Sequence, residues 1–245
     1  MRLLLVAVAA VVVLTGSPAL AAPGLDEKVY GATVEKGVSE VELRYGRLVG
    51  EQADGEDAAV LELSHGFSDR FYGAVLFGFE REPGGSRHLQ AVGAEGIVTL
   101  GHLNAIDTDV AIYGEYEAER HEADNLETKV LLQHRRGPFD GRLNLKAEKH
   151  LENGEPVEFG YGASADWKLV GDLRGGLEAF GELGSTRHLF PRAEHFVGPI
   201  LKTELEHLPA HGELEIEAGY LFAVGAARDE AKGQARLLLE YEFHF

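Results

Sequence analysis

The sequence lacks several features that stabilise other proteins or anchor them in a membrane. It contains no cysteine, so no disulfide can hold the chain together, and a core or a closed sheet must do so. After the first segment, no apolar run approaches the length that a transmembrane helix requires. Basic residues are scarce, with 23 Lys and Arg against 41 Asp and Glu, which gives a formal net charge of −18. This balance argues against nucleic acid as a partner, because binding phosphates requires a basic surface.

The first 21 residues have the organisation of a secretory signal peptide. Arg2 supplies a positive start, and the apolar run Leu3–Leu14 is too short to span a bilayer. The run is followed by Ala19-Leu20-Ala21, which has the small–x–small pattern of a cleavage site. We therefore predict cleavage after Ala21, then a periplasmic N-terminal segment over residues 22–37 and a single folded domain over residues 38–245.

The remaining chain alternates strand-length segments with turns rich in Gly, Pro, Asp and Asn. In the best of these segments, Phe159, Tyr161 and Trp167 share one face, and Glu158 and Asp166 lie on the other. Transmembrane strands need about 9–11 residues each, and single-chain bacterial barrels have an even number of strands. We predict twelve strands, at residues 38–47, 58–65, 71–82, 88–100, 107–118, 126–135, 139–150, 156–169, 173–183, 195–206, 213–223 and 234–245.

The alternation by itself allows two architectures. In a soluble sandwich the apolar faces would form a core, whereas in a membrane barrel they contact lipid and the charged faces line the lumen. The signal peptide and the even strand number favour the membrane barrel. The prediction is an all-β protein, a transmembrane antiparallel up-and-down β-barrel in the cell outer membrane, with outer-membrane lipid as a partner.

The C-terminal strand gives independent support. Leu237, Leu239, Tyr241, Phe243 and Phe245 lie on one face of a period-two pattern, and such a strand left at an exposed edge would invite aggregation. The segment resembles the C-terminal strand of bacterial outer-membrane barrels, whose terminal Phe and alternating aromatic residues are read by the barrel-assembly machinery. The resemblance implies that Tyr241, Phe243 and Phe245 form an assembly signal and that this machinery is a partner.

Charge is unevenly distributed among the predicted lumen positions. Neighbouring strands near the two termini carry an acidic wall, formed by Glu40, Glu42, Glu204, Glu206, Glu213, Glu215, Glu217, Glu240 and Glu242. Strands across the barrel carry a basic-rich wall, formed by Lys129, Arg135, Arg142, Lys146 and Lys168. Such walls either create a transverse electric field that favours cations or zwitterions, or simply provide ion pairs that satisfy the polar groups of a narrow lumen.

The whole chain resembles the small outer-membrane barrels of the porin type in Gram-negative bacteria, for which no functional residues are established. The resemblance and the acidic wall predict a channel for passive passage of small cationic or zwitterionic solutes, without a cofactor. Twelve strands lie between barrels filled by side chains and barrels filled by water, so the strand number leaves the state of the lumen open. The connections are too short to fold into a large plug.

Two alternatives remain, a metal-binding or structural barrel and, less favoured, a lipid-modifying enzyme. His188 and His195 lie in or beside a predicted outer loop and are candidate metal ligands, although the pattern specifies no metal site. Nucleophilic catalysis would require a serine activated by a base. Ser64 and His65 are adjacent, so their side chains leave the strand on opposite faces, and no GxSxG motif occurs. We therefore predict that the protein is not an enzyme.

Overall fold

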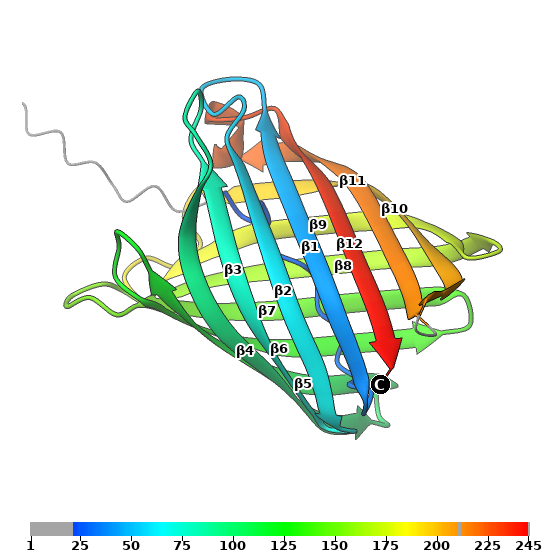
Figure 1. Cartoon of the computed structure of the whole chain (residues 1–245). Coiled ribbons are helices and arrows are strands. Elements are labelled where there is room, and N and C mark those ends of the chain that lie inside the picture. The colour runs from blue at the N-terminus through cyan, green and yellow to red at the C-terminus, as the bar shows by residue number, and fades with distance from the viewer. Residues whose placement is uncertain (1–21, 210–211, 245) are drawn as a thin grey trace, which may run out of the picture.

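Twelve antiparallel strands close into one barrel in the computed structural model, which describes residues 22–209 and 212–244. Each strand pairs with its neighbours in the chain, and the last strand pairs with the first (Figure 1). The strands are β1 (Val38–Val49), β2 (Asp57–Ser68), β3 (Phe71–Arg81), β4 (His88–Leu103), β5 (Thr108–Glu119), β6 (Asn125–Arg136), β7 (Phe139–His150), β8 (Glu158–Val170), β9 (Leu173–Ser185), β10 (Glu194–Leu208), β11 (Gly212–Gly225) and β12 (Gly233–His244).

The predicted fold class and strand number are confirmed, and the strand limits differ from the predicted ones by a few residues. The largest extensions are at the C-terminal ends of β2 and β4, which continue to Ser68 and Leu103. Both strands contain register shifts there, between Gly66 and Ser68 and between Thr99 and Gly101. Such irregularities blur the two-residue periodicity from which a sequence predicts strand ends.

The polarity of the barrel is that of a membrane protein. Large apolar side chains are exposed on its outside, among them Leu43, Val75, Ile112, Val130 and Leu201. The buried side of the strands carries charged and polar groups, namely Glu42, Arg44, Glu62, Glu95, Glu127, Lys129, Gln133, Asn144, Asp166, Glu178, Lys202 and Glu217. This arrangement is the reverse of a soluble sandwich, so the sandwich alternative is excluded.

Connections at the two ends of the barrel differ in length. Tight turns join β2 to β3, β6 to β7 and β8 to β9 at the end where β1 begins and β12 ends, which we call the inner mouth. Longer connections lie at the opposite end, the outer mouth, and one contains the short 3₁₀ helix η2 (Ala226–Asp229). No helix within residues 22–209 and 212–244 is long and apolar enough to cross a membrane.

Residues 22–37 run through the barrel, which corrects the prediction of a periplasmic segment ahead of the first strand. Ala22 belongs to a buried cluster with Ala53 and Ala231, which lie in outer connections. At the other end, the amide of Gly37 donates a hydrogen bond to the carbonyl of Gly66 near the inner end of β2, with 2.8 Å between the atoms. The chain therefore enters at the outer mouth, crosses the lumen and turns into β1 at the inner mouth (Figure 1). We call residues 22–37 the lumen segment.

Candidate channel lumen

Apolar contacts and side-chain hydrogen bonds hold the first part of the lumen segment against one side of the barrel. Leu25 and Val29 are buried in a cluster with Phe180, Phe196 and Leu221 of β9, β10 and β11. In the same part, the side-chain amide of Gln234 donates a hydrogen bond to the carbonyl of Pro23 over 3.1 Å. The barrel wall is apolar on this side of the lumen because it contacts the lumen segment and not water.

The second part of the lumen segment crosses to the opposite wall. Asn144 of β7 makes two hydrogen bonds to the backbone of Tyr30, accepting from its amide at 2.7 Å and donating to its carbonyl at 3.0 Å. The Gln133 side chain of β6 accepts a hydrogen bond from the amide of Ala32 at 3.0 Å. Asn and Gln side chains thus satisfy backbone groups that no sheet partner pairs, as buried peptide groups require.

Two glycines of the wall allow the lumen segment to come close. A side chain at Gly46 of β1 would place its Cβ 1.8 Å from the carbonyl oxygen of Leu25. A side chain at Gly66 of β2 would place its Cβ 1.9 Å from the carbonyl oxygen of Glu35. Real Cβ contacts do not come this close, so the absence of a side chain at both positions is a condition for the segment's path.

The lumen segment separates two water-accessible chambers. The outer chamber has a volume of about 400 Å³, and the inner chamber about 480 Å³. Among residues 22–209 and 212–244, Tyr30 alone lines both chambers, and its hydroxyl donates a hydrogen bond to Glu95 at 2.8 Å. The Lys129 ammonium lies 5.1 Å from the centre of the Tyr30 ring and 4.6 Å from that of Tyr113, where it makes cation–π contacts. The region between the two chambers therefore contains tyrosines, carboxylates and one lysine.

Carboxylates recur along the lumen wall from one mouth to the other, with an interruption at β3. Because the strands are tilted, residues paired in register climb the barrel from strand to strand. One such row starts near the inner end of β11 and ends at the outer end of β8. It consists of Glu213, Glu242, Glu40, Ser64, Ala74, Glu95, Glu115, Glu127, Glu148 and Glu158.

A second row runs beside the first, one lumen position away on each strand. It consists of Glu204, Glu215, Glu240, Glu42, Glu62, Leu76, Gly93, Glu117, Asn125 and His150. We call the two rows together the carboxylate track. Like charges directly opposite on neighbouring strands destabilise a sheet, so these rows carry an energetic cost that a purely structural barrel could avoid.

Lys28 of the lumen segment occupies the inner half of the track. Its Nζ lies 2.6 Å from a carboxylate oxygen of Glu42, 3.6 Å from one of Glu62 and 3.6 Å from one of Glu240. Arg44 pairs with the first two of these carboxylates, at 3.2 Å and 3.0 Å. Glu42 and Glu62 are each only 1% exposed, so these pairs are shielded from solvent and the charges need their partners.

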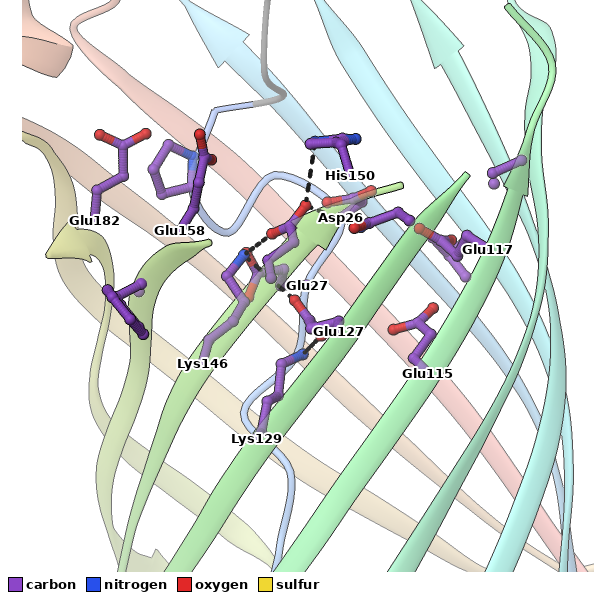
Figure 2. A pocket seen from close by; sticks show the side chains of 18 of the residues that line it. Asp26, Glu27, Glu115, Glu117, Glu127, Lys129, Lys146, His150, Glu158 and Glu182 are labelled. Atoms are coloured by element: carbon purple, nitrogen blue, oxygen red, sulfur yellow. Dashed lines mark hydrogen bonds and ion pairs between the residues drawn. The ribbon is translucent and has the colours of Figure 1, made fainter. Parts of the chain in front are cut away.

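In the outer chamber, two lysines neutralise a minority of the acids. Lys146 contacts Glu27 at 2.9 Å, Glu148 at 3.2 Å and Glu127 at 3.5 Å, and Lys129 contacts Glu127 at 2.7 Å. Figure 2 shows these groups pointing toward one another across the chamber, with further carboxylates around them. The chamber is lined by eleven acidic residues, Asp26, Glu27, Glu80, Glu115, Glu117, Glu119, Glu122, Glu127, Glu148, Glu158 and Glu182, against Arg44, Lys129 and Lys146.

The residues of the predicted acidic wall are brought together on neighbouring strands but do not all line a chamber. Those lining the inner chamber are Glu40, Glu215, Glu217, Glu240 and Glu242. Glu42 lies behind them, paired with Lys28. Glu204 and Glu213 continue the carboxylate track outside the chamber lining, and Glu206 is exposed beside the irregular end of β10. The contribution of this wall to ion selection stays a prediction.

The predicted basic wall is divided between the two chambers. Arg135 and Arg142 line the inner chamber, whereas Lys129 and Lys146 line the outer one. Lys168 lies near the inner end of β8, where its side chain is 53% exposed and pairs with Asp172 at 3.3 Å. The five residues therefore do not form one wall facing the acidic residues, because the tilt of the strands displaces them along the barrel axis.

The sequence analysis missed two components of the lumen. The carboxylates of the outer half, such as Glu95, Glu115 and Glu117, lie on lumen positions that alternation predicts, but only the strand register connects them to the inner acids. The lumen segment was missed because it has no period of its own. A pointer to it exists in the sequence, since Leu25, Val29 and Tyr30 are apolar residues in a stretch expected to be solvated.

The candidate metal and nucleophile residues do not form a complete site. His188 is exposed and His195 has Tyr161 as its hydrogen-bond neighbour at 3.4 Å. The single compact group of potential metal ligands among the described residues, Glu40, Glu240 and Glu242, contains no histidine.

One serine contacts a histidine. Ser39, not Ser64, lies 2.8 Å from the Nδ1 of His65, but it is 6% exposed. Within the described chain no carboxylate bonds to that ring, so a triad is not assembled. Ser64, the serine considered in the sequence, instead donates a hydrogen bond to Glu40 at 2.9 Å.

The aromatic end of the last strand has the expected pairing. Tyr241 and Phe243 stack with ring centres 5.9 Å apart on one face of β12. Phe245 and the predicted signal peptide lie outside the described residues. The role of these aromatic residues as an assembly signal stays a prediction.

Comparison with known proteins finds structural but not sequence relatives. No family model and no curated protein sequence matches the chain. Among solved structures, the COG4313 outer membrane channel from Pseudomonas putida F1 superposes with a TM-score of 0.59 at 12% identity, covering 86% of this chain and 97% of that one. The KdgM porin in complex with disordered oligogalacturonate gives 0.55 at 12%, covering 84% and 99%. The NanC porin gives 0.54 at 10%, covering 84% and 100%.

At this level of identity the similarity shows a shared fold. The closed twelve-strand barrel, its apolar outer belt and its charged lumen define the class to which the chain belongs. The protein is a transmembrane β-barrel of the outer membrane, with the fold found in porins and channels.

Proposed function

We propose that the protein is an outer-membrane channel for small cationic solutes and that the lumen segment restricts passage in the state described here. The observation that carries the proposal is the carboxylate track, which runs along the lumen wall between the two mouths and is interrupted where it crosses β3. A row of carboxylates lowers the energy of a cation at each successive position and repels anions, as acidic rings do in cation channels.

The charge surplus of both chambers supports this choice of solute. Eleven acidic residues face three basic ones in the outer chamber, and nine face four in the inner chamber. If ion pairing alone explained the lumen charge, the two signs would balance more closely. The excess carboxylates need mobile cations from solution, and a site that attracts cations at both ends favours their passage over that of anions.

Conductance in planar bilayers tests the proposal. We expect purified protein to conduct with a preference for K⁺ over Cl⁻, and the preference to fall when Glu115, Glu117 and Glu215 are all changed to Gln, because these positions belong to the track. Glu206→Gln is the control for charge loss outside the lumen, since it removes one carboxylate that lines neither chamber.

Neutralising the basic residues has the opposite sign. Changing Lys129, Arg142 and Lys146 to Gln together should strengthen the preference for cations, because the positive charges that oppose them are lost. A preference for anions in the wild type would contradict the proposed function.

A further inference from the structure

The site around Lys28 has the geometry of an ammonium-binding site. Glu42, Glu62 and Glu240 come from three neighbouring strands, β1, β2 and β12, and are consecutive members of one row of the carboxylate track. Their oxygens surround the Lys28 nitrogen at 2.6, 3.6 and 3.6 Å. An alkylammonium group carries three hydrogen-bond donors and no acceptor, which suits a site whose ion-pair partners for the nitrogen are all carboxylates.

These distances favour an ammonium group over a metal ion. Mg²⁺ requires oxygens at about 2.0–2.1 Å and Ca²⁺ at about 2.3–2.6 Å. Among the described residues, the compact group that could hold a metal is Glu40, Glu240 and Glu242, which excludes Glu42 and Glu62. The distances from the carboxylate oxygens to the centre of this site therefore suit an ammonium group better than a metal ion.

Among the charged residues of this site, Lys28 alone does not belong to the barrel wall. Lys28 lies on the lumen segment, which contacts the wall through apolar packing, hydrogen bonds and the ion pair of Glu27 with Lys146. Glu42, Glu62 and Arg44 lie on strands paired on both sides. Displacing the segment would leave three carboxylates with Arg44 alone, and unpaired buried charges are strongly unfavourable. Another cation in the place of Lys28 would restore the lost charge pairing.

The location gives solutes access to that position. Lys28 and Glu240 both line the inner chamber, and Glu42 and Glu62 lie directly behind them. We propose that Glu42, Glu62 and Glu240 form a binding site for a primary ammonium group, which Lys28 fills in this structure and which a solute carrying a primary amine fills once the lumen segment is displaced. That such a solute passes through the barrel rests on the proposed function. Binding at the site itself can be measured without a conductance experiment.

Chemical rescue of Lys28→Ala tests the site. The substitution removes three methylene groups and the ammonium nitrogen, which together correspond to n-propylammonium. We expect the variant to have a lower midpoint of thermal unfolding in detergent, and n-propylammonium to restore it in a saturable way. Tetramethylammonium has the same charge without an N–H donor, so it should restore little, and Mg²⁺ should restore no more than K⁺ does.

Two variants provide controls. Lys28→Met fills the space without the charge, so n-propylammonium should have no saturable effect on it. Lys232→Ala removes an ammonium that is 70% exposed and 3.7 Å from Glu51, so it should respond to none of the compounds. If Lys28→Ala refolds only when n-propylammonium is present, the inference is supported by the yield of folded protein instead of the midpoint.

Several results would overturn the inference. They are equal rescue by tetramethylammonium, better rescue by Mg²⁺, an equal response of the Lys232 variant, and failure of Lys28→Ala to fold with any of these cations. A failure of the proposed function is distinguishable, because it would leave the rescue intact while wild type and Lys28→Ala both conduct nothing in bilayers.

Discussion

The substitution Gly46→Val should displace the lumen segment without changing any charge. A Cβ at this position would lie 1.8 Å from the carbonyl oxygen of Leu25, more than about 1 Å closer than real Cβ contacts come. β1 cannot move away, because its residues pair with both β2 and β12. The overlap must therefore be relieved by the segment around Leu25.

The energy cost of the clash and the stabilisation from burying Leu25 are of similar size. Overpacking a well-packed site costs about 1–3 kcal/mol. Leu25 is 2% exposed, and burying a leucine side chain contributes about 1.5–3 kcal/mol. The clash thus offsets the main apolar anchor of the first part of the segment, while the strand pairing of the barrel stays intact.

Two measurements report this displacement. The chain has no cysteine, so Ala22→Cys provides a single reporter that is 7% exposed in the present structure. We expect maleimide labelling of this cysteine to accelerate at least severalfold in the Gly46→Val background, and the mean single-channel conductance to rise. Gly114→Val in β5 is the matched control, because no atom lies within 4 Å of its Cβ position. Faster labelling with unchanged conductance would refute the assignment of the segment as the restriction.

Three further predictions concern the membrane, the assembly and the processing of the barrel. Ile216→Arg on the lipid-facing side of β11 should lower the free energy of unfolding by about 2–4 kcal/mol, measured in bilayers by denaturant titration. Glu215→Gln should change this free energy far less. A larger effect of Glu215→Gln would contradict the assignment of the two faces. Deleting Phe245 should reduce the amount of heat-modifiable protein in outer-membrane fractions, and normal insertion would argue against its role in assembly. N-terminal sequencing of the mature protein should begin at Ala22, and finding that protein soluble in the periplasm would contradict the location.

The sequence was sufficient for the barrel because its lipid-facing and lumen-facing residues alternate with a period of two. Val130 and Lys129, for example, are neighbours in the chain and lie on opposite faces of β6. The same alternation predicted that Glu215 and Glu240 face the lumen. Faces follow from a local pattern, so a single sequence is enough to assign them.

Height along the barrel axis does not follow from a local pattern. Lys146 and Arg142 share one face of β7, yet they line different chambers, since four residues of a strand span much of the distance between the mouths. The path of the lumen segment also depends on distant partners, such as Asn144 for Tyr30 and Gly46 for Leu25. These contacts join residues far apart in the chain, and hydrophobic periodicity carries no information about them.

The reversal potential under a KCl gradient tests the central claim most directly, because it reports which ion crosses the lumen. It should be measured in planar bilayers on the wild type and on Gly46→Val, so that the restriction and the selectivity are separated. The account predicts a reversal potential displaced toward the equilibrium potential of K⁺ in both proteins, with larger conductance in Gly46→Val. Displacement toward the equilibrium potential of Cl⁻, or no conductance even in Gly46→Val, would contradict a carboxylate-lined cation channel.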